Sequence, residues 1–370
     1  MKILIVGNQV RTYALGFQNE ILPLLSLGHE IVWAANFSNF TGDITQIPCK
    51  TVQIDIVSYP FYRTNIKAYK QVSEIIKKDG IEAISCSTPI GGTIARLAGW
   101  RCGIKNIIYA AHGFLFFKDV PWPKRMIFKF HEMLLAKITD TLITITKEDY
   151  ESAMKFKLRS NRTPYYVHGA GVNVGVSVNL DRTTFRKELG FSENDVLIIS
   201  AGDLNDNKNN KVVIKALALV RNKNVHYLIC GHGDKKDYLM KLSESLGLCD
   251  RVHFLGYRTD MPNLLAASDI FAMPSRREGV PRAILEAMDL GLPCIGARTR
   301  GISDLIDDDL GGFTCYSESP QEFASAISIL VSDISLRNKF GLYNKTKTFE
   351  YSADVVRKEL YDIYREVLVK

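Results

Sequence analysis

Short apolar runs alternate along this chain with longer stretches of helical period, and this alternation constrains the fold more than any other feature. A parallel β-sheet covered by helices on both faces has this sequence form, because its strands are buried on both sides and joined by helical crossovers. In the first half we expect strands at 3–7, 30–35, 83–86, 106–110 and 141–145, and helices at 14–27 and 93–102. The pattern predicts an α/β fold.

The alternation occurs twice. Glycines cluster at 169–175, and the pattern then restarts with expected strands at 196–201, 225–230, 252–255, 270–273 and 293–295. We therefore expect a Rossmann-like N-terminal domain over 1–170, a linker or hinge over 171–190, a C-terminal domain over 191–350 and a terminal helix over 351–370 that packs back on the N-terminal domain. A single domain with insertions is the weaker alternative, because 370 residues exceed the usual size of one core.

Parallel sheets bind ligands outside the carboxyl ends of their strands. Two such domains facing each other would hold a substrate in a central cleft, and closure about the hinge would exclude water.

Composition and charge bound the class of protein. With 46% apolar and 24% charged residues the chain resembles ordinary globular proteins, and no apolar run is long enough to span a bilayer. The seven cysteines are scattered, which favours reduced thiols in the cytoplasm. Residues 1–175 carry 21 Lys and Arg against 13 Asp and Glu, an excess that suits an anionic membrane or a phosphorylated substrate. An ordinary solvated surface is the alternative.

Several catalytic motifs are missing. Gly7 is followed by Asn8, Gln9, Val10 and Arg11 instead of a dinucleotide-binding glycine pattern, and Gly231-His232-Gly233 lacks the third glycine. A nicotinamide oxidoreductase is therefore disfavoured. We also find no P-loop and no H-E-x-x-H or G-x-S-x-G pattern.

The segment 277–286, Arg-Glu-Gly-Val-Pro-Arg-Ala-Ile-Leu-Glu, carries the strongest chemical signal. The expected strand at 270–273 would end just before Glu278, and Pro281 suits the first position of a helix. Glu278 would then stand at a carboxyl strand end, beside the Gly279 and Val280 amides at a helix N-terminus, which is an anion site with an acceptor beside it.

Both glutamates also have structural explanations. Glu286 lies inside the expected helix, where it could pair with Arg282 four residues earlier. Glu278 could be a helix N-terminal carboxylate that the helix dipole stabilises.

The paired glutamates, the E-G-x-P start and the following L-E-A-M and G-L-P resemble the donor-binding signature of retaining glycosyltransferase family 4, whose fold is GT-B. Segments 229–233, 246–257 and 264–269 match the same family in order and spacing. The resemblance implies two Rossmann-like domains facing a central cleft. It also implies that Glu278 binds hydroxyls of a donor sugar and Glu286 the ribose.

Other donor-binding residues follow from the same resemblance. The loop 201–209, which contains Gly202 and Lys208, resembles the family's phosphate loop, but Asp203 occupies the place of its arginine. The resemblance implies that Lys208 neutralises the diphosphate, and Arg258 and Arg282 are candidates for the missing cation. Gly256 and Tyr257 fall where the family holds the nucleotide base. Turn residues after a buried strand would look the same.

In the first half, Ala-His-Gly-Phe at 111–114 resembles a motif of the subgroup that makes bacterial surface polysaccharides. The resemblance implies that His112 lies near the reacting carbon of the donor. A histidine satisfied in a core is the alternative.

Aromatic and basic residues interleave beyond this motif. Large rings and cations on one helix suit the plane of an anionic membrane, and we expect membrane contact through Phe116, Lys118, Trp122, Lys124, Arg125 and Lys129. An amphipathic core helix with a basic solvated side is the alternative.

These observations predict a retaining glycosyltransferase. We expect transfer from a nucleotide sugar, with UDP as the favoured nucleotide, to a lipid-linked or oligosaccharide acceptor in capsule or other surface polysaccharide synthesis. The protein would lie in the cytoplasm on the inner face of the plasma membrane. We expect no cofactor, no essential metal and no nucleic-acid partner. A nucleotide-sugar epimerase of the same fold and a non-catalytic donor-binding subunit are the alternatives.

Overall fold

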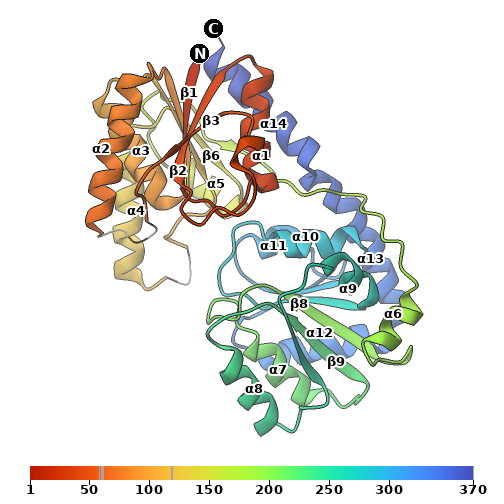
Figure 1. Ribbon diagram of the computed structural model, residues 1–370. Coiled ribbons are helices and arrows are strands. Elements are labelled where there is room, and N and C mark those ends of the chain that lie inside the picture. The colour runs from red at the N-terminus through yellow and green to blue at the C-terminus, as the bar shows by residue number, and fades with distance from the viewer. Residues whose placement is uncertain (58, 60–61, 118–119, 370) are drawn as a thin grey trace. The chain divides into compact units, whose positions relative to one another are not determined.

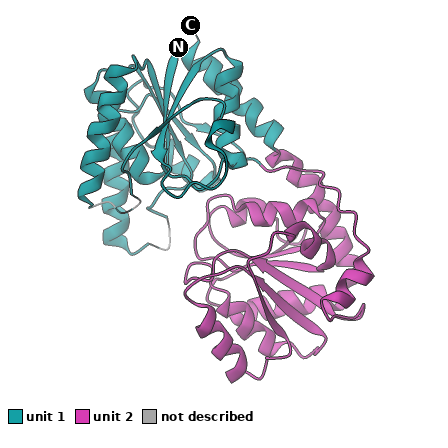
Figure 2. Cartoon of the chain, in the orientation of Figure 1, with its two compact units in different colours: residues 1–171, 353–370 teal, residues 172–352 magenta. Residues whose placement is uncertain are grey.

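The computed structural model describes residues 1–57, 59, 62–117 and 120–369. It divides into two compact units, one of residues 1–171 and 353–370 and one of residues 172–352 (Figure 2). Each unit is built on its own parallel sheet, so the α/β fold with two Rossmann-like domains that the alternation predicts is confirmed (Figure 1).

Unit 1 contains a seven-stranded sheet in the order β3-β2-β1-β4-β5-β6-β7. The strands are β1 (Lys2–Gln9), β2 (Glu30–Asn36), β3 (Lys50–Gln53), β4 (Ala83–Ser87), β5 (Asn106–Ala111), β6 (Thr141–Thr144) and β7 (Tyr165–Tyr166). The helices are α1 (Leu15–Ser26), α2 (Arg63–Lys78), α3 (Pro89–Arg101), α4 (Trp122–Ala136), α5 (Lys147–Ala153) and α14 (Ala353–Leu368), with a 3-10 turn at Ile44–Gln46.

The central strands of unit 1 are buried on both faces. Leu4 and Val6 of β1 point into the core under α2 and α3, while Ile3 and Ile5 point into a second core under α1 and α14. The buried side chains of α14 have the helical spacing that the sequence predicts for this segment. They are Ala353, Val356, Leu360, Ile363, Tyr364, Val367 and Leu368. Because α14 packs beside α1, the C-terminal segment completes the core of unit 1.

Unit 2 contains a six-stranded parallel sheet in the order β10-β9-β8-β11-β12-β13. The strands are β8 (Val196–Ala201), β9 (Val225–Cys230), β10 (Val252–Gly256), β11 (Ile270–Met273), β12 (Cys294–Ala297) and β13 (Gly312–Cys315). The helices are α6 (Arg182–Glu188), α7 (Lys211–Leu219), α8 (Lys236–Ser245), α9 (Met261–Ala267), α10 (Arg282–Asp289), α11 (Ile302–Leu305), α12 (Pro320–Ser332) and α13 (Ile334–Thr348), followed by a 3-10 turn at Phe349–Tyr351.

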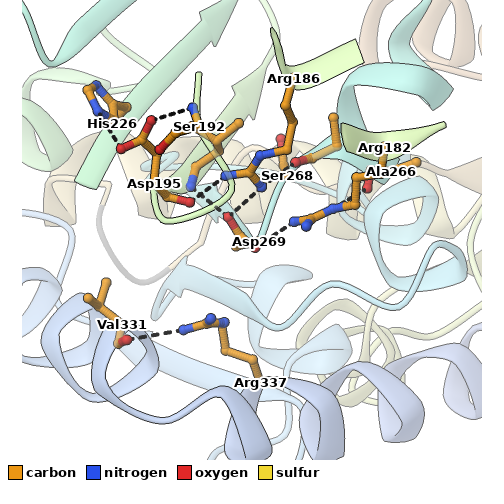
Figure 3. Close-up of polar contacts among 12 residues, drawn as sticks. Arg182, Arg186, Ser192, Asp195, His226, Ala266, Ser268, Asp269, Val331 and Arg337 are labelled. Atoms are coloured by element: carbon orange, nitrogen blue, oxygen red, sulfur yellow. Dashed lines mark hydrogen bonds and ion pairs between the residues drawn. The ribbon is translucent and has the colours of Figure 1, made fainter. Parts of the chain in front are cut away.

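The sequence predicts a linker over 171–190, but all of this segment except Gly171 belongs to unit 2. Buried Asp289 accepts hydrogen bonds from the amides of Gly175 (2.8 Å) and Val176 (3.0 Å). Arg182 and Arg186 of α6 both pair with Asp269, at 2.7 and 3.3 Å (Figure 3). These contacts fix the segment to the sheet, so the change of unit occurs between Gly171 and Val172.

Candidate functional site

The carboxyl ends of β8 and β11 meet at the centre of the unit 2 sheet. These strands are neighbours. From β8 the sheet continues through β9 to β10, and from β11 it continues in the opposite direction through β12 to β13. Open parallel sheets bind ligands where the strand order reverses in this way. A small pocket lies there, and its lining includes Gly202, Lys208 and Pro274. Asn210, which also lines this pocket, accepts a hydrogen bond from the buried Tyr227 hydroxyl (2.9 Å).

Lys208 and Glu278 form an ion pair beside this pocket, although they are 70 residues apart in the chain. Lys208 Nζ lies 2.8 Å from Glu278 Oε1, and both side chains are largely buried. The structure thus brings together two residues that the sequence predicts for the donor site. A cation and a carboxylate here can bind a phosphate oxygen and a sugar hydroxyl respectively, provided that their mutual contact opens.

Glycines allow Lys208 to lie close to the main chain. Gly202 has φ +146°, and a Cβ atom on it would lie 3.0 Å from Lys208 Cε. Gly231 has φ +143°, and a Cβ atom there would lie 1.9 Å from the Gly202 carbonyl oxygen. The loops after β8 and β9 therefore stack backbone on backbone. The Gly231 amide also donates to Gly256 O (2.7 Å), which extends the stack to the loop after β10.

Two asparagines join the Lys208 loop to the segment before Glu278. Asn207 Nδ2 donates to Arg277 O (3.0 Å), and the Arg276 amide donates to Asn207 O (2.8 Å). Asn209 Nδ2 donates to Pro274 O (3.3 Å) and to Ser317 O (2.7 Å). We did not predict these positioning residues. The Asn-Lys-Asn run was the signal that could have indicated them.

The helix after Glu278 begins one residue later than predicted. Pro281 is its N-cap and α10 starts at Arg282, so Gly279 and Val280 form a bend that precedes the helix. Gly301, with φ +77°, packs against this bend so closely that a Cβ atom would overlap the Gly279 carbonyl oxygen. A glycine contact therefore fixes the peptide beside Glu278.

Glu286 lies one helical turn after Arg282, and the two form the i, i+4 pair that was the structural alternative for this glutamate. Arg282 Nη2 is 3.6 Å from Glu286 Oε1, and both side chains are exposed. Partial burial raises the pKa of Glu286, while the positive charge of Arg282 opposes the rise. The pair does not prevent a hydroxyl from binding to the carboxylate.

The loop after β10 carries Tyr257 and Arg258. The exposed Tyr257 ring stacks near His232 with an interplanar angle of 22°, and the Tyr257 amide donates to His232 Nε2 (3.3 Å). Arg258 makes two contacts with Asp260, at 2.8 and 2.6 Å. Its charge is already neutralised, which makes Arg258 the weaker candidate for the missing cation. Asp203, which occupies the place of the family's arginine, is exposed.

In unit 1, His112 directly follows β5 at the carboxyl end of that sheet. Its Nε2 lies 3.1 Å from Oε1 of Glu20 on α1, and the ring is 37% exposed. Burial lowers the pKa of His112, but the hydrogen bond and charge of Glu20 outweigh this effect and raise it overall. Glu20 is a residue that the sequence did not indicate.

The residues exposed on and just before α4 differ from those that we predicted for a membrane face. Phe116 is only 5% exposed and stacks on Phe114 with ring centroids 4.8 Å apart, so its expected membrane contact is wrong. Lys118 lies outside the described residues. Trp122 and Lys124 are exposed, while Arg125 and Lys129 are half-buried.

The exposed face of α4 is more apolar than the sequence suggested. Trp122, Ile127 and Phe130 are 72%, 66% and 61% exposed. Exposed apolar side chains on the same helix also include Met126, Met133 and Leu134. A core helix with a solvated basic side does not present such a face, and a cluster of this kind marks an interaction surface.

The described residues contain no cluster of histidine, cysteine or acidic side chains that could hold a metal ion. The acidic run at 307–309 has the spacing of an Asp-x-Asp motif, but its side chains serve the fold. Asp307 binds Tyr343 Oη (2.5 Å) and Lys347 Nζ (2.7 Å), and Asp308 Oδ2 accepts from Thr314 Oγ1 (2.8 Å). Among the described helices none is both long and apolar enough to cross a membrane.

The family model described as glycosyl transferases group 1 matches residues 181–347. The provisionally named glycosyltransferase EpsD of Bacillus subtilis (strain 168) is 32% identical to this chain. The match covers 91% of this chain and 89% of EpsD. The chain belongs to the group 1 glycosyltransferases.

A second relative of this group 1 glycosyltransferase is an Escherichia coli protein named UDP-Gal:alpha-D-GlcNAc-diphosphoundecaprenol alpha-1,3-galactosyltransferase. It is 26% identical over 82% of this chain and 80% of its own length.

Solved structures show the same GT-B fold. Anabaena HepE in complex with UDP has a TM-score of 0.80 at 19% identity, covering 99% of this chain and all of its own. WaaG, a glycosyltransferase involved in lipopolysaccharide biosynthesis, has a TM-score of 0.74 at 17% identity and covers both chains fully.

Proposed function

We propose that this glycosyltransferase moves a sugar from a UDP-sugar to a glycan acceptor carried on a lipid, with retention of the anomeric configuration, in bacterial surface polysaccharide synthesis. The name of the E. coli relative supports a UDP-sugar donor and a diphosphoundecaprenol acceptor. HepE, which shares the fold, has been crystallised with UDP and with UDP-glucose. The carrying observation in this chain is the Lys208–Glu278 pair at the carboxyl ends of β8 and β11.

The geometry gives each partner a task. Negative charge develops on the diphosphate as it leaves the sugar, so a fixed cation beside it lowers the barrier. We assign this task to Lys208, assisted by the amides of Gly279 and Val280 ahead of α10. Glu278 then accepts hydrogen bonds from hydroxyls of the donor sugar. Donor binding would replace the Lys208–Glu278 contact by one contact of each side chain with the substrate.

The remaining donor contacts are proposals on the same basis. The main chain at Gly256 and Tyr257 would hold the base, and Glu286 would bind the ribose. We propose Arg282 as the second cation, since its single contact with Glu286 (3.6 Å) is longer than the two contacts of Arg258 with Asp260 (2.8 and 2.6 Å). His112 of unit 1 would act on the donor near the reacting carbon.

The direct test combines purified protein, a panel of nucleotide sugars and a lipid-linked acceptor. We expect a UDP-sugar to raise the thermal midpoint by mass action and to be consumed only with acceptor present. Proton NMR should show that the new glycosidic bond in the product has the same anomeric configuration as the donor. Chelating agents should leave the transfer rate unchanged, because we expect no essential metal. Conversion of the donor to its epimer without acceptor would instead support the epimerase. UDP binding without turnover for any acceptor would support the non-catalytic subunit.

Glu278→Ala tests the site itself. We expect kcat to fall by roughly 10²–10³-fold because contacts made at the reacting centre are lost. Glu244→Ala on the exposed side of α8 is the matched control and should keep wild-type kinetics. Unchanged kcat in Glu278→Ala would refute the assignment.

We further propose that α4 lies on the inner face of the plasma membrane, where a lipid-linked acceptor would be found. Its exposed Trp122, Ile127 and Phe130 suit the acyl boundary, while Lys124 and the basic excess of the first half suit anionic headgroups.

Sedimentation with vesicles tests this surface. Wild-type protein should sediment with phosphatidylglycerol vesicles, and the triple change of Trp122, Ile127 and Phe130 to Ser should release it. Charge reversal at Lys124, Arg125 and Lys129 should release it too. Met240→Ser, an exposed apolar position on α8 of unit 2, is the control. Equal sedimentation of all forms would exclude a membrane role for α4.

A further inference from the structure

Glu20 of α1 is a buried carboxylate that the donor site of unit 2 does not use. The residue is 8% exposed and lies next to Ile21 and Leu24, which belong to the apolar core under α1. Its carboxylate Oε1 lies 3.1 Å from Nε2 of His112, with which it forms an ion pair when the ring is protonated. Burying a carboxylate costs free energy that one contact with a partly exposed ring does not return, so packing alone would favour an apolar residue here.

Hydrogen bonds of the neighbouring residue Asn19 fix the part of α1 that carries Glu20. Asn19 donates from Nδ2 to Ala170 O (2.7 Å) and accepts from Arg357 Nε of α14 (2.8 Å). These bonds hold the helix against the end of unit 1 and against the C-terminal helix. The carboxylate therefore has a defined place beside a small cavity that Ala110 and His112 also line.

The contact determines which ring nitrogen remains for a ligand. Because Glu20 accepts at Nε2, that nitrogen carries the proton in both charge states, and Nδ1 remains for other contacts. The carboxylate also stabilises the imidazolium form, in which Nδ1 carries a proton as well. Nδ1 is therefore a hydrogen-bond donor in the imidazolium form and an acceptor in the neutral form.

We propose that Glu20 is a positioning residue, which holds the His112 ring through Nε2 so that Nδ1 faces a hydroxyl of the bound nucleotide sugar. The proposal rests on the function proposed above, because it assigns His112 to the donor. It adds a residue of α1 to the machinery of a reaction whose other groups lie at strand ends. Glu20 itself does not touch the substrate.

Glu20→Gln and Glu20→Asp test this role, since the first removes the charge at constant size and the second keeps the charge. In Glu20→Gln we expect kcat to fall on the order of tenfold with the donor KM within about twofold, and Glu20→Asp to recover part of the loss. NMR titration of the His112 ring, assigned by comparison with His112→Asn, should show a lower pKa in Glu20→Gln than in wild type. Glu30→Gln, on the exposed end of β2, is the control.

The outcomes separate the two proposals. An active enzyme whose Glu20→Gln variant keeps wild-type kcat, or whose His112 pKa does not change, refutes the role of Glu20 alone. A kcat loss that accompanies a lower thermal midpoint, with no recovery in Glu20→Asp, also refutes it, because that pattern indicates damage to α1. A wild-type protein that transfers no sugar from any nucleotide sugar refutes the proposed function itself.

Discussion

At the scale of single residues, glycines decide how closely the loops of unit 2 approach one another. Gly202 and Gly231 have φ values that residues with a Cβ rarely adopt, and each faces a neighbour that a Cβ would push. The neighbour of Gly202 is Lys208, the proposed phosphate cation. The neighbour of Gly231 is the backbone of Gly202. A side chain at either position would therefore disturb the donor site before it disturbed the core.

Gly202→Ala should weaken UDP binding about tenfold or more, because the new Cβ displaces Lys208. Gly247→Ala is a matched control, since Gly247 also has positive φ but has no other atom near its Cβ position. Both variants should lose roughly 1–2 kcal/mol of unfolding free energy through backbone strain. Isothermal calorimetry with UDP and urea unfolding measure the two effects. Equal UDP affinity in both variants would contradict the steric account.

The residue types in the sequence allowed us to predict the chemistry of the site, but not the contacts that its residues make. Glu278 could be chosen from the sequence by its place between an expected strand and helix, and Lys208 by the resemblance of its loop to a phosphate loop. Their ion pair, however, depends on a fold that joins positions 70 residues apart. Asn207 and Asn209 escaped notice because they act on carbonyl groups of a distant loop. Phe116 was misplaced because the alternation of rings and cations does not show which rings stack on each other.

At the scale of elements, a buried ion pair connects α4 to the rest of unit 1. Arg96 of α3 donates from Nη1 to Glu132 of α4 (2.9 Å) and lies over the Tyr109 ring of β5, 3.8 Å from its centroid. Both charged groups are buried. The inner side of α4 is thus anchored by charge and aromatic contact, while its apolar outer side remains exposed.

Glu132→Ala should cost about 3–5 kcal/mol of unfolding free energy in unit 1, because it leaves the Arg96 guanidinium buried without its carboxylate. Glu151→Ala, at an exposed position of α5, should change stability by less than about 0.5 kcal/mol. Urea unfolding followed by fluorescence measures both. A loss in Glu132→Ala as small as the control's would mean that water reaches Arg96.

The sequence predicted central elements well and edge elements poorly. The bounds expected for β8, β9 and β11 match the structure, since these strands are apolar on both faces and end at turn residues. Three strands were not expected. Of these, β3 (Lys50–Gln53) is polar at both ends, β7 has two residues, and β13 begins with glycine. Each lies at the edge of its sheet and pairs with a single neighbour, so fewer of its side chains are buried and its apolar pattern is weak.

At the scale of the whole molecule, the tryptophans report on one unit. All three, Trp33, Trp100 and Trp122, belong to unit 1, whereas Lys208, Glu278 and the other proposed donor contacts belong to unit 2. Tryptophan fluorescence should therefore report on the unfolding of unit 1, and the stabilisation by UDP should report on unit 2.

Removal of residues 353–370 should lower or abolish the fluorescence transition, because α14 covers one core of unit 1 with six buried apolar side chains. At about 1.5–3 kcal/mol each, their contribution is comparable with the whole stability of a domain. The calorimetric transition that UDP stabilises should persist, since unit 2 keeps all its residues. A truncated chain with the wild-type fluorescence transition, or without any response to UDP, would contradict this division.

The bridge between Val172 and Ser352 brings the two ends of unit 2 together, with the Val172 amide donating to Tyr351 O at 3.0 Å. Everything that unit 2 needs lies in one continuous stretch of chain, whereas unit 1 needs α14 to cover one face of β1 although its strands are made first. The residues of unit 2 are therefore all synthesised before those of unit 1 are complete. A nascent chain arrested before α14, and extended by a linker that carries residue 352 out of the exit tunnel, should hold a folded unit 2 and an N-terminal half that still needs protection from aggregation.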